Sequence, residues 1–225
     1  MLQDIIFIAI ILILFYISIR IGILDIWGSI LSLFLGIFVY YFGGPEYLIL
    51  LISFVAVSYL ATVYKSKYKR DIYGMSTKRM AGSVISKGII PFILIIIPFL
   101  PQVRFYLFSA SVAVATADTV SGEIGIFSEN TYTPIGFKKT KPGEEGAVSI
   151  LGEISALVSS STIALIYFIF SKNLIYSFFV IIIGFVGANI DSILGATLEK
   201  RGIIGKHAVN ILAIIISIIF AYTLI

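Results

Sequence analysis

The sequence has no cysteine and a single histidine, His207, among its 225 residues. Without cysteine the chain can form no disulfide, thiolate metal site or thiol nucleophile. A single histidine argues against an imidazole-based zinc site and against a Ser-His-Asp triad. Charge is also scarce, because charged residues make up 12% of the chain, whereas a soluble domain carries about 25%.

Hydrophobic residues make up 59% of the chain, and the mean hydropathy is +1.08. This composition predicts an all-α, polytopic integral membrane helical bundle. A membrane-spanning helix needs about 20 mostly apolar residues. That criterion predicts about eight spans, with seven as the alternative count, near residues 3–19, 22–42, 46–64, 80–100, 104–126, 147–170, 173–198 and 207–225.

The basic residues predict the orientation, because cytoplasmic loops carry an excess of Lys and Arg. If the loop after the third span is cytoplasmic, only Arg104 and Lys172 of the 16 Lys and Arg lie on the other side. We therefore expect a multi-pass protein of the cell membrane with both termini outside. The basic loops, and with them the expected active site, would face the cytoplasm.

We interpret residues 1–225 as a single membrane domain. Residues 1–64 form scaffold spans, residues 65–87 a basic cytoplasmic loop, and residues 88–225 the catalytic spans with a cytoplasmic loop at 127–146. The net charge of +4 is concentrated in a few loops, so it indicates anionic lipid headgroups as partners and no nucleic acid. Lysines such as Lys65 and Lys69 fit that role. The sequence leaves the oligomeric state open.

Three acids lie inside or at the ends of apolar spans: Asp118, Glu123 and Asp191. Carboxylates at membrane depth are expensive, so they usually face a polar cavity or a cation. Hydrogen-bonded packing between helices explains the neighbouring serines and threonines but not these acids. Mg²⁺ or Mn²⁺ is the simpler explanation, since such ions bind carboxylate and hydroxyl oxygens.

A loop rich in lysine and glycine separates the two acidic segments. Lys138, Lys139 and Lys141 supply cations, and the residues from Gly146 to Ser149 are expected to open the next helix. A helix N-terminus binds phosphate readily, although a solvated basic loop explains the same residues. Lys87, about two turns inside the fourth span, either extends to the interface or meets a phosphate.

The runs ATADTVSGEIG, KPGEEGAVSILGE and GANIDSILGATLE resemble the transmembrane protein 19 family, also known as domain of unknown function 92. The resemblance covers most of the chain and is strongest from about 78 to 215. It implies a CTP-dependent kinase that converts an isoprenoid monophosphate, such as phytyl or geranylgeranyl phosphate, to the diphosphate, as the family's plant phytyl-phosphate kinase does. The family's P-G-T-N-G-G loop reads Pro-Gly-Glu-Glu-Gly-Ala here, at residues 142–147.

The resulting hypothesis is a lipid-phosphate kinase that uses Mg²⁺ (or Mn²⁺) and a nucleoside triphosphate, with CTP favoured over ATP. The alternatives are a cytidylyltransferase that makes a CDP-lipid and an ion or metabolite transporter. The expected site comprises the catalytic groups Asp118, Glu123, Asp191 and Lys141, the metal ligands Asp118, Glu123 and Asp191, and the nucleotide or phosphate ligands Lys87, Thr119, Ser121, Lys138, Lys139, Gly143, Gly146, Ser149, Asn189, Ser192 and Asn210.

Overall fold

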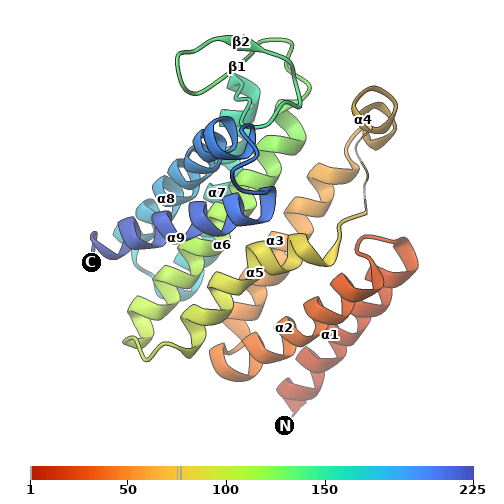
Figure 1. Ribbon diagram of the computed structural model, residues 1–225. Coiled ribbons are helices and arrows are strands. Elements are labelled where there is room, and N and C mark those ends of the chain that lie inside the picture. The colour runs from red at the N-terminus through yellow and green to blue at the C-terminus, as the bar shows by residue number, and fades with distance from the viewer. Residues whose placement is uncertain (1, 75, 77) are drawn as a thin grey trace.

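The computed structural model describes residues 2–74, 76 and 78–225, and the chain is helical apart from one short hairpin (Figure 1). The elements in chain order are α1 (Leu2–Ile21), α2 (Ile26–Gly43), α3 (Pro45–Val63), α4 (Ser66–Tyr73), α5 (Ala81–Ile96), α6 (Pro101–Gly125), β1 (Thr131–Tyr132), β2 (Lys139–Thr140), α7 (Ile150–Ser171), α8 (Leu174–Leu194), a π-helical turn η1 (Gly195–Glu199) and α9 (Lys206–Tyr222).

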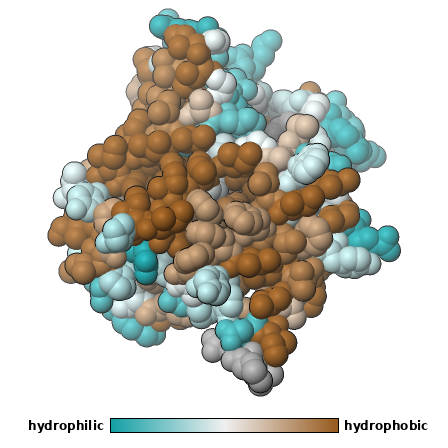
Figure 2. Space-filling view, turned by 60° about the horizontal axis from the view of Figure 1, so that its bottom comes forward, coloured by the Kyte–Doolittle hydropathy of each residue, from teal (hydrophilic) through white to brown (hydrophobic). Residues whose placement is uncertain are grey.

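The predicted all-α membrane bundle is confirmed. Each of the eight expected spans overlaps one helix of at least 16 residues. Within the described residues, α1, α2, α3, α7 and α8 are long and apolar enough to cross a membrane, while α5 and α9 are shorter apolar helices. Apolar side chains cover much of the face shown in Figure 2. The number of spans and the side of each terminus stay predictions.

The polar segments gather at one end of the bundle. Figure 1 shows α4 and the β1–β2 hairpin together, at the end opposite the N-terminus. These segments carry much of the basic charge, and their clustering agrees with loops that share one side of a membrane.

Helix α6 is the centre of the fold, and it packs against α3, α5, α7, α8 and α9. Its residues from Phe105 to Ala117 are all buried, and most of them are Ala, Ser, Val or Thr. Small side chains let neighbouring backbones approach closely, which is how helices associate in lipid. The moderate polarity of α6 is therefore compatible with a central helix that other helices shield from lipid.

Gly187 sets the distance of α8 from α6 and α9. A Cβ added at Gly187 would lie 2.5 Å from a methyl of Val114 and 2.7 Å from the hydroxyl of Ser217. One turn beyond this contact, α6 carries Asp118 and α8 carries Asp191. The glycine contact thus places the two acids side by side.

Several expected boundaries need correction. The fourth span ends at Ile96 rather than near residue 100, because Pro98 and Pro101 restrict the residues that precede them to extended backbone. The loop at 127–146 contains a β-hairpin. Helix α7 begins at Ile150, so the segment from Gly146 to Ser149 precedes the helix instead of opening it.

Candidate active site

Two acids from separate helices meet inside the bundle. The carboxyl groups of Asp118 on α6 and Asp191 on α8 lie within hydrogen-bonding reach of each other. Both line a narrow gap together with Lys87 and Asn210. Two carboxylates this close repel each other unless a proton or a cation lies between them. The pair is therefore suited to holding a cation.

Lys87 of α5 turns toward the acids. Its Nζ donates hydrogen bonds of 2.5 Å to Asp118 Oδ2 and 2.5 Å to Thr119 Oγ1. The lysine side chain is 8% exposed, so of the two alternatives for this residue the structure excludes extension to the interface. Lys87 supplies a buried positive charge next to the two carboxylates.

The start of α9 closes another side of the gap. Asn210 Nδ2 donates to Ser86 Oγ of α5 at 3.3 Å. Lys206, in the first turn of α9, interacts electrostatically with both aspartates. The His207 ring fits against Gly82, where an added Cβ would lie 2.4 Å from Nε2, and this close approach holds the α9 N-terminus against α5.

The structure does not group Glu123 with the two aspartates, which corrects the expected three-carboxylate metal site. Glu123 Oε2 accepts from Lys69 Nζ at 2.8 Å. Glu123 Oε1 accepts from Arg79 at 3.1 Å and from Thr62 Oγ1 at 2.9 Å. Among the described residues, no three carboxylate, imidazole or thiol groups lie together as metal ligands.

Lys69 and Arg79 reach Glu123 from outside the spans. Lys69 of α4 is 2% exposed and also donates to the carbonyl oxygens of Ala61 and Thr62. The Arg79 backbone is fixed to the α1–α2 turn, where its N–H donates to Ile23 at 3.0 Å. Lys69 is thus a buried ion-pair partner, which corrects its expected role as a lysine that attracts lipid headgroups.

The three lysines of the loop are exposed to solvent. Lys138, Lys139 and Lys141 make no side-chain hydrogen bond or ion pair to another residue that the structure describes. The loop beside them is well anchored, since Glu144 accepts from Thr140 Oγ1 at 2.6 Å and pairs with Lys200 at 2.9 Å. The hydrogen bonds from these two partners lower the pKa of Glu144 to about 2.

The glycines of the loop serve close packing. Gly146 has φ +70°, and a Cβ there would lie 2.3 Å from the Ala196 amide nitrogen and 2.4 Å from the Ser192 carbonyl oxygen. The loop therefore rests on the junction of α8 and η1. Gly143, with φ +83°, lies next to the Tyr73 ring of α4.

Three further expected ligands, Ser121, Ser149 and Asn189, make hydrogen bonds within the protein. Ser149 caps α7 by accepting from the Gly152 amide at 3.1 Å, and its hydroxyl donates to the Gly125 carbonyl. Asn189 donates to Glu153 Oε2 at 2.9 Å. Ser121 Oγ donates to the Asp118 carbonyl at 3.0 Å. These contacts give the serines and the asparagine structural roles close to the site.

Sequence reasoning missed Lys206, Arg79 and Glu153 as neighbours of the site. Each of these residues lies in a loop or near a helix terminus, where charged side chains usually face the membrane interface. Their positions in the sequence therefore did not indicate a role in the site. The π-helical turn η1, closed by a 3.0 Å hydrogen bond from the Lys200 amide to the Gly195 carbonyl, was also missed. Such turns within helices are frequent at functional sites.

The donor set fits Mg²⁺ bound together with a ligand. Mg²⁺ is usually held by one or two carboxylates plus substrate phosphates and water, and it seldom occupies an all-protein cage. Asp118 and Asp191 supply two carboxylates, and Lys87 supplies a cation for a phosphate. Two acids and a lysine inside a helical bundle are typical of a membrane-embedded binding or catalytic site.

These features define the class: an integral membrane helical protein with a buried polar site built from several helices. The chain belongs to the integral membrane protein family DUF92, which matches residues 9–217. It is 32% identical over 197 residues, 86% of this chain and 82% of the relative, to the uncharacterized membrane protein MJ0933 of Methanocaldococcus jannaschii. It is also 33% identical over 103 residues to Protein PGR of Arabidopsis thaliana, which covers 40% of this chain and 36% of that protein. No solved structure matches the chain.

Proposed function

We propose that the protein is a CTP-dependent prenyl-phosphate kinase, which transfers a phosphoryl group to a membrane isoprenoid monophosphate to give the diphosphate. The observation that carries the proposal is the juxtaposition of Asp118, Asp191 and Lys87 inside the bundle. Phosphoryl transfer depends mainly on positioning and on neutralising charge. A site among membrane helices favours a lipid as the acceptor.

Asp118 and Asp191 are the residues that would hold Mg²⁺ or Mn²⁺, and the ion would neutralise and orient the nucleotide phosphates. Lys87, already buried next to Asp118, is placed to donate to a phosphoryl oxygen. Lys206 adds a positive charge that interacts electrostatically with both aspartates. Both lysines would stabilise the negative charge on the transferring group.

The acceptor is a phosphate monoester, which is ionised near neutral pH, so it requires no strong general base. This requirement is compatible with a site whose polar side chains are carboxylates, an amide and lysines. We assign the exposed Lys138, Lys139 and Lys141 to the phosphates of the incoming nucleotide, at the cytoplasmic end of the bundle. Glu123 takes no part in metal binding in this proposal, and it holds Lys69 and Arg79 in place.

The test is transfer of the γ-phosphate from labelled CTP to geranylgeranyl phosphate by the purified protein. We expect a labelled diphosphate lipid, and a loss of at least 100-fold in rate for Asp118→Asn and for Asp191→Asn. The matched control is Asp71→Asn, an acid of α4 whose side chain is 54% exposed. Release of pyrophosphate with a CDP-lipid would instead identify a cytidylyltransferase, and full activity of both site variants would refute the proposed site.

A further inference from the structure

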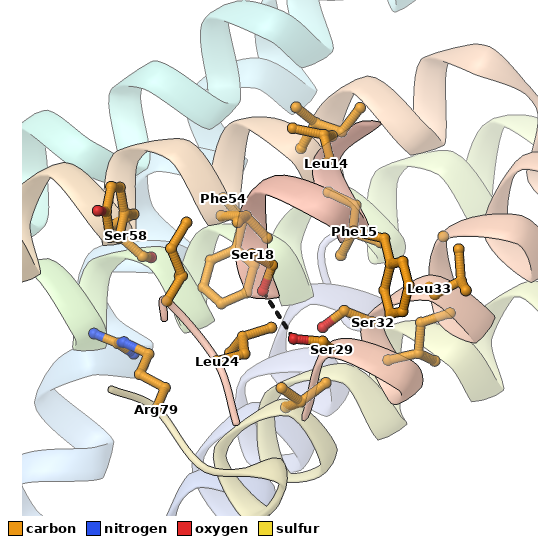
Figure 3. A pocket seen from close by; sticks show the side chains of 18 of the residues that line it. Leu14, Phe15, Ser18, Leu24, Ser29, Ser32, Leu33, Phe54, Ser58 and Arg79 are labelled. Atoms are coloured by element: carbon orange, nitrogen blue, oxygen red, sulfur yellow. Dashed lines mark hydrogen bonds between the residues drawn. The ribbon is translucent and has the colours of Figure 1, made fainter. Parts of the chain in front are cut away.

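An apolar cavity of about 360 Å³ lies between α1, α2, α3 and α5 (Figure 3). This volume falls within the range of small-molecule binding sites, about 300 to 1,000 Å³. Its walls are mainly aliphatic and aromatic, with residues such as Leu14, Phe15, Leu33 and Phe54. The cavity therefore suits a hydrophobic chain better than a polar metabolite.

One end of this cavity is positively charged and borders the aspartate site. Arg79, Ser83 and Lys87 line the cavity, and Lys87 also lines the gap that holds Asp118 and Asp191. Figure 3 shows Arg79 and Ser58 toward one end and Leu33 toward the other. An anionic head on a hydrophobic chain would thus place its charge next to the two aspartates.

Arg79 retains donors for such a head. Its hydrogen bonds to Thr62 and Glu123 both use NH2. An arginine carries five N–H donors in a planar fork, so the remaining donors are available to a phosphate. Arginine is well matched to phosphate geometry.

A second observation points independently to an occupant. Ser58 lines the cavity, is 4% exposed, and has a buried hydroxyl without a hydrogen-bond partner among the described residues. Buried polar groups in proteins are nearly always satisfied, and an exception requires an explanation. By contrast, Ser18 and Ser29 of the same cavity bond to each other at 3.0 Å. A ligand oxygen or water near Arg79 would satisfy Ser58.

The packing of α1 provides a route from the bilayer. Helix α1 packs mainly against α2, whereas α3, across the cavity, packs against α2, α6 and α7. Of the residues Asp4–Ile21 in α1, 11% are buried. A loosely held helix beside an apolar cavity lets a lipid chain pass sideways from the membrane.

We propose that this cavity holds the chain of the prenyl phosphate, with the phosphate between Arg79 and Lys87. The inference rests on the proposed kinase function and assigns substrate recognition to α1, α2 and α3, which the sequence suggested to be scaffold. The cavity, at about 360 Å³, has room for part of a prenyl chain. A longer chain extends from it into the lipid.

Binding is measured first, so that the test does not depend on catalysis. The protein in phosphatidylcholine nanodiscs is unfolded thermally with geranylgeranyl monophosphate, dimethylallyl monophosphate or inorganic phosphate, since a ligand of the folded state raises apparent stability. We expect stabilisation by geranylgeranyl monophosphate only. Ser32→Phe, which fills the cavity, should weaken this binding at least 10-fold, whereas Ile30→Phe, on the exposed face of α2, should not.

A photoreactive geranylgeranyl phosphate provides a second readout that does not need a folded variant. In the wild-type protein we expect labelled peptides from residues 11–36 and 48–59. Labelling on α7 and α8 instead, or equal binding by Ser32→Phe and Ile30→Phe, would overturn the cavity assignment. Binding as predicted without phosphate transfer from CTP would retain the cavity and refute the kinase.

Discussion

The ion pairs of Glu123 allow a quantitative test of its structural role. Glu123→Gln leaves Lys69, which is 2% exposed, with two backbone carbonyls and no counter-charge. Removing one partner of a buried ion pair costs about 3–5 kcal/mol. Because the side chains of Glu123 and Arg79 are 12% and 23% exposed, we expect Glu123→Gln to cost about 3 kcal/mol of unfolding free energy, the lower end of that range. Lys69→Met should cost less, about 1–2 kcal/mol, since Glu123 keeps Arg79.

The double variant carries the decisive information. Glu123→Gln leaves the Lys69 charge unpaired, and Lys69→Met removes that charge. The loss of unfolding free energy in the double variant should therefore be smaller than the sum of the two single losses by at least about 1.5 kcal/mol. Reversible unfolding in mixed detergent micelles gives these free energies. Arg70→Met with Asp71→Asn, an exposed pair 3.7 Å apart on α4, is the matched control and should show little coupling.

The same cycle separates a structural from a metal-binding Glu123. If Glu123 only balances Lys69 and Arg79, the double variant should regain stability and bind Mn²⁺ as the wild-type protein does. Strictly additive costs, or a double variant that is stable but binds no Mn²⁺, would contradict the role assigned here.

Three further results follow from the geometry. Gly187→Val should destabilise the protein by about 1–3 kcal/mol and lower activity more than its stability explains, because its added atoms meet Val114 2.5 Å away; unchanged unfolding would contradict this packing. Gly146→Ala should detach the loop and raise the KM for nucleotide, because the added Cβ meets backbone at φ +70°; an unchanged KM would argue against the loop's role. The hydrogen bonds from Thr140 and Lys200 lower the pKa of Glu144 from 4.5 to about 2. Their contribution to stability is therefore present above about pH 4.5 and is lost as the pH falls toward 2. The stability difference between wild type and Glu144→Gln should shrink over that range, and a constant difference would refute these contacts.

The helices were predictable because hydrophobic length and proline restrict the chain so strongly. The two aspartates were predictable for a related reason, since an acid inside an apolar span needs a partner. Their meeting also depends on the small residues at the α6–α8 contact, where Gly187 lies against Val114.

Glu123 shows why closeness in the sequence did not predict the metal ligands correctly. Asp118 and Glu123 are five residues apart, which places their side chains about 140° apart around a helix of 3.6 residues per turn. The acids therefore face different neighbours. The partners of Glu123 are Lys69 of α4 and Arg79, and both lie outside the apolar spans.

The cavity in the N-terminal part was not predictable from the sequence. The spans at residues 1–64 show no polar pattern that distinguishes a scaffold from a binding site. Their cavity arises because α1 and α3 both pack on α2 without closing on each other. The spacing between α1 and α3 depends on how the helices pack, and the hydropathy of the sequence does not indicate it.

The most direct test of the central claim measures metal binding by electron paramagnetic resonance of Mn²⁺ added to the purified protein with CTP. We expect one tightly bound Mn²⁺ per chain, lost in both Asp118→Asn and Asp191→Asn and retained in Asp71→Asn. Unaltered Mn²⁺ binding in both aspartate variants would contradict a shared metal site between α6 and α8.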